Sequence, residues 1–211
     1  MVEVQLGYKT VDLPYTVRIH GVTEQEFDDL ADEDTKAELF DGVMIVHSPA
    51  TWEHDDIGGF VRTLMRCYAE ARKAGHVLGP DTLVQLAARR KFAPDALFVR
   101  KRRVPKPRPK LFKGAPDSIL EVLSPSTRDD DLEYKRPAYR AAGVREIWFI
   151  DPANQEVFVD QLQGSEYLES ILHSGKLHSI VLKGFWIEVR WLWADPMPVV
   201  MDCLRQIMED K

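Results

Sequence analysis

Two almost entirely apolar segments, DSILEVL at 117–123 and REIWFID at 145–151, constrain the fold of this chain most strongly. The stretch between them has a helical composition over about 130–142 and reaches a glycine at Gly143. Strands this apolar are covered on both faces, and a strand–helix–strand connection of this length joins parallel strands. The sequence therefore predicts a βαβ unit within an α/β fold.

Shorter patterns predict the elements around this unit. A capping box that begins at Thr23 precedes a short helix over about 24–31, and an Asp-Gly pair at 41–42 predicts a β-hairpin. Apolar residues at steps of three and four from Thr51 predict a long helix that stops at Gly75. An edge strand or extended arm is expected within residues 1–20. Further strands are expected at about 76–79, 81–87, 95–100, 156–162, 167–173 and 178–182, with a last helix at about 197–209.

No linker or low-complexity segment divides the chain, so we expect one domain over residues 1–211, with a core at about 23–195. No apolar run approaches the roughly 20 residues that a membrane span needs. The N-terminus lacks the basic start and apolar block of a secretory signal. Cys67 and Cys203 have no metal-ligand spacing and suit a reducing compartment. These features predict a cytoplasmic protein.

Two acidic residues stand in apolar strands, where an unpaired charge is costly. Asp95 follows a proline and opens the segment ALFV, and Glu121 lies 26 positions later within DSILEVL. Because side chains alternate along a strand, Glu121 shares a face with Ile119 and Leu123. If the two strands are neighbours, both carboxylates converge on one point. Hard oxygen ligands of this kind suit Mg²⁺ or Mn²⁺.

Positive charge is concentrated between these two acids. Residues 89–113 contain eleven Lys or Arg and one acid, giving +10, whereas the whole chain carries −6 and the remainder therefore −16. Such a segment suits contact with nucleic-acid phosphates, and a solvated basic loop is the alternative. Three prolines favour an extended loop for KRRVPKPRPKLFKG. The candidate phosphate contacts are Arg100, Lys101, Arg102, Arg103, Lys106 and Arg108.

Taken together, these segments resemble a known family. The matching pieces are AELFDGVMIVHSP, Trp52-Glu53-His54, APDALFV, GAPDSILEVLSPSTRDDDLEYK and YRAAGVREIWFIDP. They resemble the Uma2 family, also called DUF820, of the PD-(D/E)xK nuclease superfamily, over about residues 23–195. The resemblance implies the restriction-endonuclease-like fold, a mixed central β-sheet flanked by helices. It also implies a Mg²⁺-dependent endonuclease that hydrolyses phosphodiester bonds of DNA.

The resemblance further implies a set of catalytic residues. The superfamily's lysine usually stands two positions after the acid, where this chain has Leu123, and the family moves it to the following helix, where Lys135 matches. Pro137 is costly in a helix interior, so we expect this helix to start near Glu133, with Lys135 in its first turn. The implied catalytic residues are Asp95, Glu121, Lys135 and Glu38, with Asp95 and Glu121 as ligands of Mg²⁺ or Mn²⁺.

Other polar and aromatic residues near the motifs receive a structural interpretation. His54 is expected to cap the long helix or to bond the region of Glu38, and Asp117 is expected to lead into its strand. The rest are expected to start the next helix (Ser124, Ser126, Thr127) or to lie in the core or a dimer contact (Trp186, Trp191, Trp193).

Three functions stay open on the sequence. The first is a Mg²⁺-dependent nuclease that acts on DNA as a homodimer, without a nucleotide cofactor and away from membranes. The second is a catalytically inactive DNA-binding or regulatory protein on the same fold, which the missing lysine at position 123 favours. The third is a structural protein whose acids merely cap strands.

Overall fold

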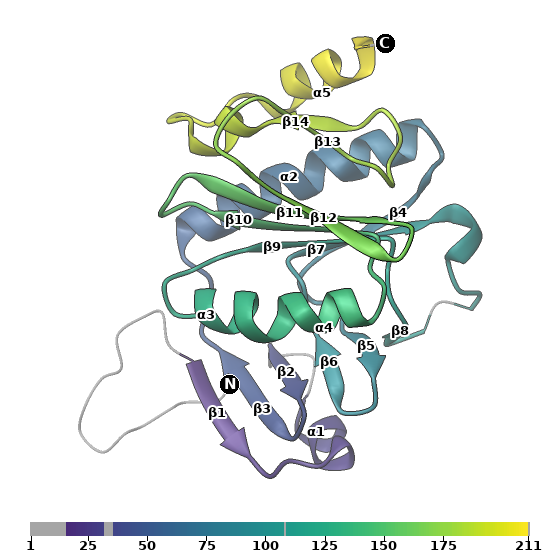
Figure 1. The fold of residues 1–211 in the computed structure, drawn as a ribbon, viewed down its shortest axis with the longest axis vertical. Helices are drawn as coiled ribbons and strands as arrows, with labels where there is room; N and C mark the ends of the chain where they lie inside the picture. Colours follow the sequence, from purple (N-terminus) through teal and green to yellow (C-terminus); the bar gives the residue numbers. More distant parts are fainter. Residues whose placement is uncertain (1–15, 32–35, 108, 211) are drawn as a thin grey trace.

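Two six-stranded sheets and one two-stranded sheet make up the β-structure of the described residues, which are 16–31, 36–107 and 109–210 of the computed structural model (Figure 1). The first, here called the central sheet, has the order β12 (Glu166–Leu172), β11 (Glu156–Gln163), β10 (Glu146–Asp151), β9 (Ser118–Val122), β7 (Ala96–Arg100), β4 (Gly75–Leu78). The second, here called the N-terminal sheet, has the order β1 (Thr16–His20), β3 (Val43–His47), β2 (Ala37–Phe40), β6 (Arg90–Phe92), β5 (Val84–Ala87), β8 (Phe112–Lys113).

The predicted βαβ unit is confirmed in the central sheet. β9 and β10 pair in parallel, with Phe149 opposite Glu121. β7 pairs with the other side of β9 in the antiparallel sense, with Ala96 opposite Leu120. The sheet is therefore mixed, and helices flank it, as the predicted fold class requires.

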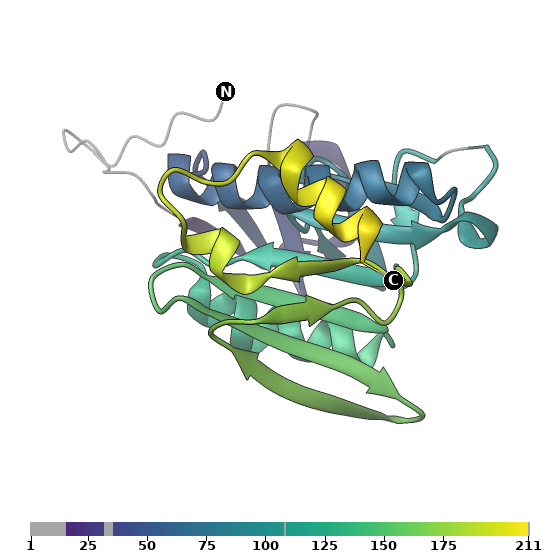
Figure 2. The same ribbon diagram turned by 90° about the horizontal axis from the view of Figure 1, so that it is seen from above.

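Helices cover both faces of the central sheet (Figure 2). α2 (Trp52–Ala71) and α5 (Val200–Glu209) lie over one face, and α3 (Arg128–Asp130) and α4 (Arg136–Ala141) lie over the other. Strand alternation sorts the apolar side chains between two cores. The core on the α2 side includes Phe98, Leu120, Val122, Trp148 and Ile150. The core on the α4 side includes Leu97, Val99, Ile119, Leu123 and Phe149.

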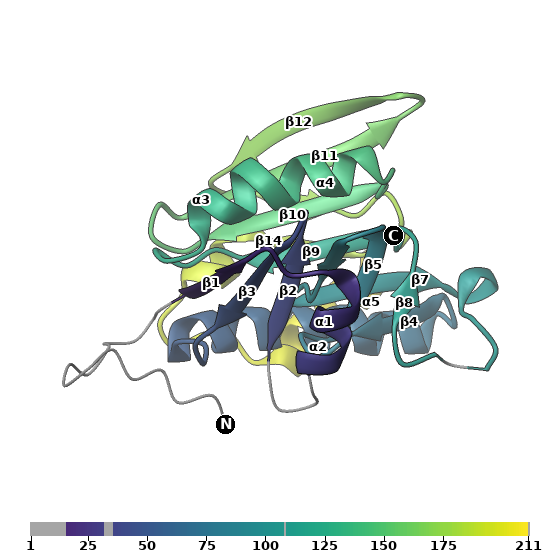
Figure 3. The ribbon, with the colours of Figure 1, turned by 90° about the horizontal axis from the view of Figure 1, so that it is seen from below.

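The N-terminal sheet and α1 (Glu24–Leu30) lie below α3 and α4 in Figure 1 and are seen from their own side in Figure 3. Aromatic contacts join this sheet to the helices. The ring centroids of Phe92 in β6 and Tyr139 in α4 are 5.5 Å apart, and those of Phe40 and Tyr134 are also 5.5 Å apart. The helical segment after β9 is thus packed between the two sheets.

This helical segment starts earlier than the sequence predicts. It begins at Arg128 rather than near Glu133, and residues Asp131–Lys135 form a π-helical turn, η2, between α3 and α4. The N–H of Arg136 donates to the carbonyl of Asp131, five residues back. A proline ring crowds the carbonyl four residues before it in an α-helix, and the wider π turn relieves that crowding ahead of Pro137. Lys135 therefore ends a π turn and does not lie in a first helical turn.

The prediction of a strand at residues 178–182 is wrong. Residues 178–182 turn back, and β13 (Lys176–His178) pairs with β14 (Trp186–Glu188) in the separate two-stranded sheet. The hydroxyl of Ser179 causes the turn, since it accepts from the N–H of Leu182 at 2.9 Å and donates to Glu146 at 2.7 Å.

The tryptophans near the C-terminus pack in the core. Trp186 is buried, and its ring centroid lies 5.3 Å from that of Trp191.

Gly75 does not end the long helix. α2 ends at Ala71, and Lys73 takes the positive φ of 52° after its last turn. Gly75 instead opens β4, where a Cβ atom would lie 2.1 Å from the carbonyl oxygen of Val99. The glycine permits a close approach of two strands.

We expect Gly75→Ala to lower the free energy of unfolding by on the order of 1–3 kcal/mol, because the backbone of β7 must shift to admit the methyl group. Gly59→Ala is the matched control: no atom lies within 4 Å of its Cβ position inside α2, so alanine stabilises by about 1 kcal/mol. Urea unfolding of both variants measures the difference. Equal stability of Gly75→Ala and the wild type would contradict the close approach.

Within the described ranges, no helix combines the length and the apolar character needed to cross a membrane. Cys67 is partly buried and Cys203 is buried, and both are free thiols.

Candidate active site

The two predicted metal ligands meet at one end of the central sheet. Asp95 directly precedes β7, and Glu121 lies in β9 next to it. The N–H of Asp95 donates to Glu121 Oε2 at 3.4 Å, and the N–H of Val122 donates to Asp95 Oδ2 at 2.8 Å. Both residues are buried, with exposed fractions of 6% and 3%. Strand alternation puts Glu121 on the α4 face, as predicted.

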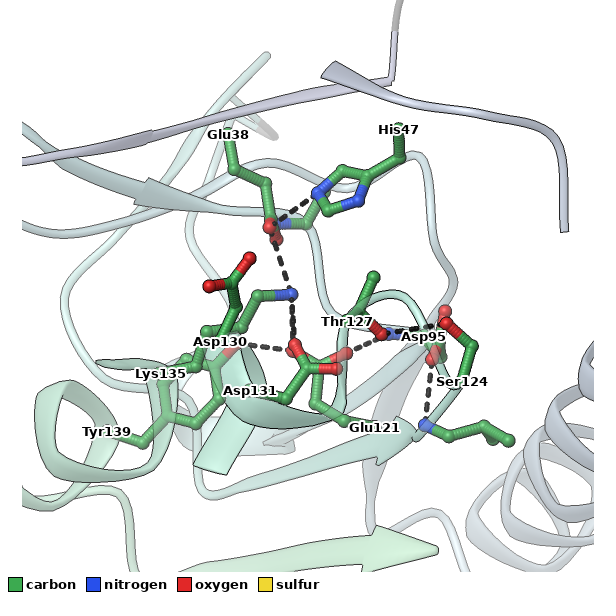
Figure 4. Close-up of polar contacts among 12 residues, drawn as sticks. Glu38, His47, Asp95, Glu121, Ser124, Thr127, Asp130, Asp131, Lys135 and Tyr139 are labelled. Atoms are coloured by element: carbon green, nitrogen blue, oxygen red, sulfur yellow. Dashed lines mark hydrogen bonds and ion pairs between the residues drawn. The ribbon is translucent and has the colours of Figure 1, made fainter. Parts of the chain in front are cut away.

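Lys135 reaches the same place from the helical segment (Figure 4). Its Nζ lies 2.9 Å from Glu38 Oε2, 3.0 Å from Asp131 Oδ1 and 3.4 Å from Glu121 Oε1. Burial lowers the pKa of this ammonium, but the carboxylates of Asp131, Glu121 and Glu38 together raise it well above its usual value. Lys135 is therefore a permanent cation at the centre of the cluster.

Glu38 brings the N-terminal sheet into the site. It lies in β2 and is fully buried. Its Oε1 accepts from the N–H of Ala93 at 2.9 Å, and its Oε2 lies 2.9 Å from His47 Nε2. Burial raises the pKa of Glu38, but Lys135, His47 and the Ala93 N–H outweigh it and lower that pKa well below the usual range. Glu38 stays ionised.

Asp95 is held by two further side chains. His54 Nε2 lies 3.2 Å from its Oδ2, and Lys36 Nζ lies 3.4 Å from its Oδ1. Burial raises the pKa of Asp95, but the hydrogen bond of His54 and the charge of Lys36 lower it below its usual range. His54 stands in the first turn of α2 and its backbone N–H donates to Thr51, yet its imidazole contacts Asp95 and not Glu38.

Glu121 behaves in the opposite way. Burial raises its pKa most, Lys135 lowers it, and the carboxylates of Asp95, Asp131 and Glu38 raise it again, to about 8. Its Oε1 accepts from the hydroxyl of Tyr139 at 2.5 Å. Neighbouring carboxylates with pKa values displaced in opposite directions are typical of sites that hold or move a proton.

Sequence reasoning missed four members of this cluster: Asp131, Tyr139, His47 and Lys36. Asp131 and Tyr139 each stand four positions from Lys135, a spacing that puts all three on one helical face, and this signal was available. His47 and Lys36 carry no such signal, because only the pairing of β2 with β3 and the approach of the chain to Asp95 place them.

The donor set fits a hard divalent cation. In the part of the chain that the structure describes, no three His, Cys, Asp or Glu side chains form a ready-made metal cage. Mg²⁺ needs none, because it binds through one or two carboxylates and completes its shell with water and substrate phosphate. The cluster contains four carboxylates against the two ammonium groups of Lys36 and Lys135, and a divalent cation would offset this excess of acids. Its four buried carboxylates are Glu38, Asp95, Glu121 and Asp131.

The part of the basic segment from Arg100 to Arg103 lies at the opposite end of β7 from Asp95. Five residues at about 3.3 Å each separate Arg100 from Asp95 by about 16 Å. Asp117, which leads into β9 as predicted, is buried and pairs with Arg103 at 3.0 Å and with Arg100 at 3.6 Å. Of the other predicted phosphate contacts, Lys101, Arg102 and Lys106 are exposed, and Arg108 lies outside the described residues.

The sequence model of the Uma2 family, described as "Putative restriction endonuclease", matches residues 24–190. The chain belongs to the Uma2 family. The matched range contains all four predicted catalytic residues of this Uma2 chain. A comparison of the chain with curated proteins found no match.

One similar solved structure is described as a putative nuclease belonging to DUF820 from Anabaena variabilis ATCC 29413. It has a TM-score of 0.72 at 18% identity and covers 82% of this chain and 97% of its own. At this identity the likeness shows that the Uma2 chain shares that fold.

Proposed function

We propose that this Uma2 protein is a Mg²⁺- or Mn²⁺-dependent endonuclease that hydrolyses phosphodiester bonds of DNA. One observation carries the proposal: Asp95, Glu121 and Lys135 come from a strand start, a neighbouring strand and a helical turn and meet at one point. The family description of a restriction endonuclease supports the same reaction class.

The charge of each residue determines its proposed role. Asp95 and Glu121 would hold the cation, which lowers the pKa of an attacking water and neutralises charge on the phosphate. Lys135 is protonated throughout the working pH range, so it donates hydrogen bonds to the water or the phosphate and does not act as a base. Glu38 orients that ammonium through the 2.9 Å contact.

The rival is a catalytically inactive DNA-binding protein on the same fold. One observation favours it: the exposed fraction of the four predicted catalytic residues is at most 7%, so a phosphate reaches them only after the cluster opens. In this rival, the ion pairs of Lys135 serve stability alone.

Incubation of the full chain with supercoiled plasmid and Mg²⁺ or Mn²⁺ tests the proposal. Cleavage that EDTA abolishes supports the nuclease. If the protein binds DNA but cleaves it with neither metal, the nuclease proposal is wrong and the DNA-binding function is established.

The metal affinity should depend on pH through Glu121. Its pKa is about 8 without the cation, so below pH 8 a proton must leave before the carboxylate can bind a metal. We expect the Mn²⁺ affinity to rise by up to about tenfold per pH unit from pH 6 to 8 and to level off above it. Titration calorimetry in buffers of different ionisation enthalpy measures both the affinity and the released proton. A flat affinity over this range would contradict the assignment.

We also propose that residues 1–211 fold as one domain and associate as a homodimer, since a two-fold pair presents two sites to the two strands of a duplex. Light scattering on the protein as it elutes from a sizing column tests the dimer.

The exposed cations of the basic segment would contact phosphates about five base-pair steps from the cut bond, at about 3.4 Å per step.

A further inference from the structure

A hollow lies at the end of α2 that is remote from the acid cluster. Its volume is about 670 Å³, within the range of small-molecule sites. Three elements line it and leave it widely open to solvent: the C-terminal end of α2, the end of β7 with the 3₁₀ turn η1 (Lys101–Arg103), and the loop around 181–184. The floor is apolar and includes Tyr68, Phe98 and Val181, each of which is buried.

Hydrogen bonds and close packing hold these walls together. The hydroxyl of Tyr68 donates to the carbonyl of Lys183 at 3.1 Å, and a Cβ atom at Gly184 would lie 2.5 Å from the same hydroxyl. The N–H of Lys101 donates to the carbonyl of Ala74 at 2.8 Å and joins η1 to the end of the helix. The hollow is therefore part of the folded framework.

The rim is strongly cationic. Arg72, Lys101, Arg102 and Lys183 line it, and within the described ranges none of the four is in an ion pair with a carboxylate. The guanidinium of Arg72 lies 5.3 Å from the centre of the Tyr68 ring and 3.5 Å from the carbonyl of Met208, so it is positioned without being neutralised.

The other two charged residues that line the hollow are each in an ion pair. Arg100 pairs with Asp117, and Asp210, the one acid among the lining residues, pairs with Lys176. Four cations without carboxylate partners around an apolar floor form a site for an anion that carries an apolar group.

The hollow is separate from the candidate active site. His54 at the start of α2 contacts Asp95, and eighteen residues at about 1.5 Å each place Arg72 about 27 Å further along the helix. In Figure 1, α2 runs across the molecule from left to right, so its two ends lie on opposite sides.

We propose that this hollow binds a phosphate ester of a ring-bearing compound, of the nucleoside monophosphate class. The phosphate lies among Arg72, Lys101, Arg102 and Lys183, and the ring lies against the apolar lining of the hollow. Phosphate on unpaired Arg and Lys donors supplies the charge-assisted hydrogen bonds, and the floor supplies apolar contact.

Calorimetry with the full chain tests this site with three probes: 2′-deoxyadenosine 5′-monophosphate, deoxyadenosine and inorganic phosphate. We expect the nucleotide to bind with a Kd of about 1 mM or tighter and each of the other two at least about tenfold more weakly, because each lacks one half of the contacts. In the double variant Arg72→Ala/Lys183→Ala, nucleotide affinity should fall at least about tenfold.

Arg66→Ala is the matched control, since Arg66 is an exposed cation on the same helix that does not line the hollow, and it should leave binding unchanged. Equal affinity for nucleotide and nucleoside, or for wild type and double variant, overturns the proposal. A third outcome also overturns the proposal: the wild type binds single-stranded oligothymidylate, the double variant does not, and neither binds the mononucleotide. The hollow would then be a site for a nucleic-acid strand. Asp95→Asn should not change nucleotide binding, so the result is independent of nuclease activity.

Discussion

Asp95→Asn should lower metal-dependent DNA cleavage by at least about 10²- to 10³-fold, the loss typical of removing one electrostatic stabiliser from an active site. Asparagine keeps the size of the side chain and an oxygen that can accept from the Val122 N–H, which donates to Asp95 at 2.8 Å. It removes the charge that would bind a cation beside Glu121 in the proposed function. The rate of plasmid nicking in Mg²⁺ measures the effect.

The control for this variant is Asp55→Asn, an exposed acid in the first turn of the same helix as His54. It should cleave DNA at the wild-type rate. Mn²⁺ affinity should fall in Asp95→Asn and stay unchanged in Asp55→Asn. If Asp95→Asn cleaves DNA as fast as the wild type, the cluster at the end of β7 is not the active site.

Lys135→Ala should lower the free energy of unfolding by about 3–5 kcal/mol, the cost of leaving buried charges without their counter-ion. Lys135 is 7% exposed and is the ion-pair partner of Glu38, Glu121 and Asp131. Removing the ammonium leaves three buried carboxylates to repel one another. Urea unfolding measures the loss, and Lys176→Ala, which breaks an exposed pair with Asp210, should cost at most about 1 kcal/mol.

A second variant separates the structural role of Lys135 from its proposed catalytic role. Lys135→Met/Glu38→Gln removes the cation together with one carboxylate and fills the volume, so it should recover most of the stability that Lys135→Ala loses. It should not recover cleavage, because no ammonium is left to contact the phosphate. Restored cleavage in this double variant would show that Lys135 acts only through folding.

Local patterns predicted most of the elements, because their causes lie within a few residues. The capping box at Thr23 forms as expected: its N–H donates to Glu26 at 2.8 Å, and its hydroxyl accepts from the Glu26 N–H at 3.2 Å. The alternation in β9 predicted the face of Glu121 for the same reason. The errors at Gly75 and at residues 178–182 arose where a distant contact, with Val99 and with Glu146, decided the backbone conformation.

The predicted site residues come together, but the properties of the site were not visible in the chain. The π turn that places Lys135 depends on Pro137 and on packing between two sheets. The raised pKa of Glu121 depends on burial and on carboxylates contributed by β2 and by the chain before β7. Residues Arg100–Arg103 of the basic segment, close to Asp95 in sequence, lie at the far end of the strand that follows Asp95.

Strand periodicity and residue chemistry are local, so the amino-acid sequence alone predicts the parallel pair β9–β10 and the faces of their side chains. Which charges neutralise one another, and which have no partner, depends on the folded arrangement. Electrostatic energy depends on distance through space and on exclusion of water. Glu38 and Lys135, 97 positions apart, therefore form one buried pair, whereas Arg72 and Lys183 line the rim of one hollow.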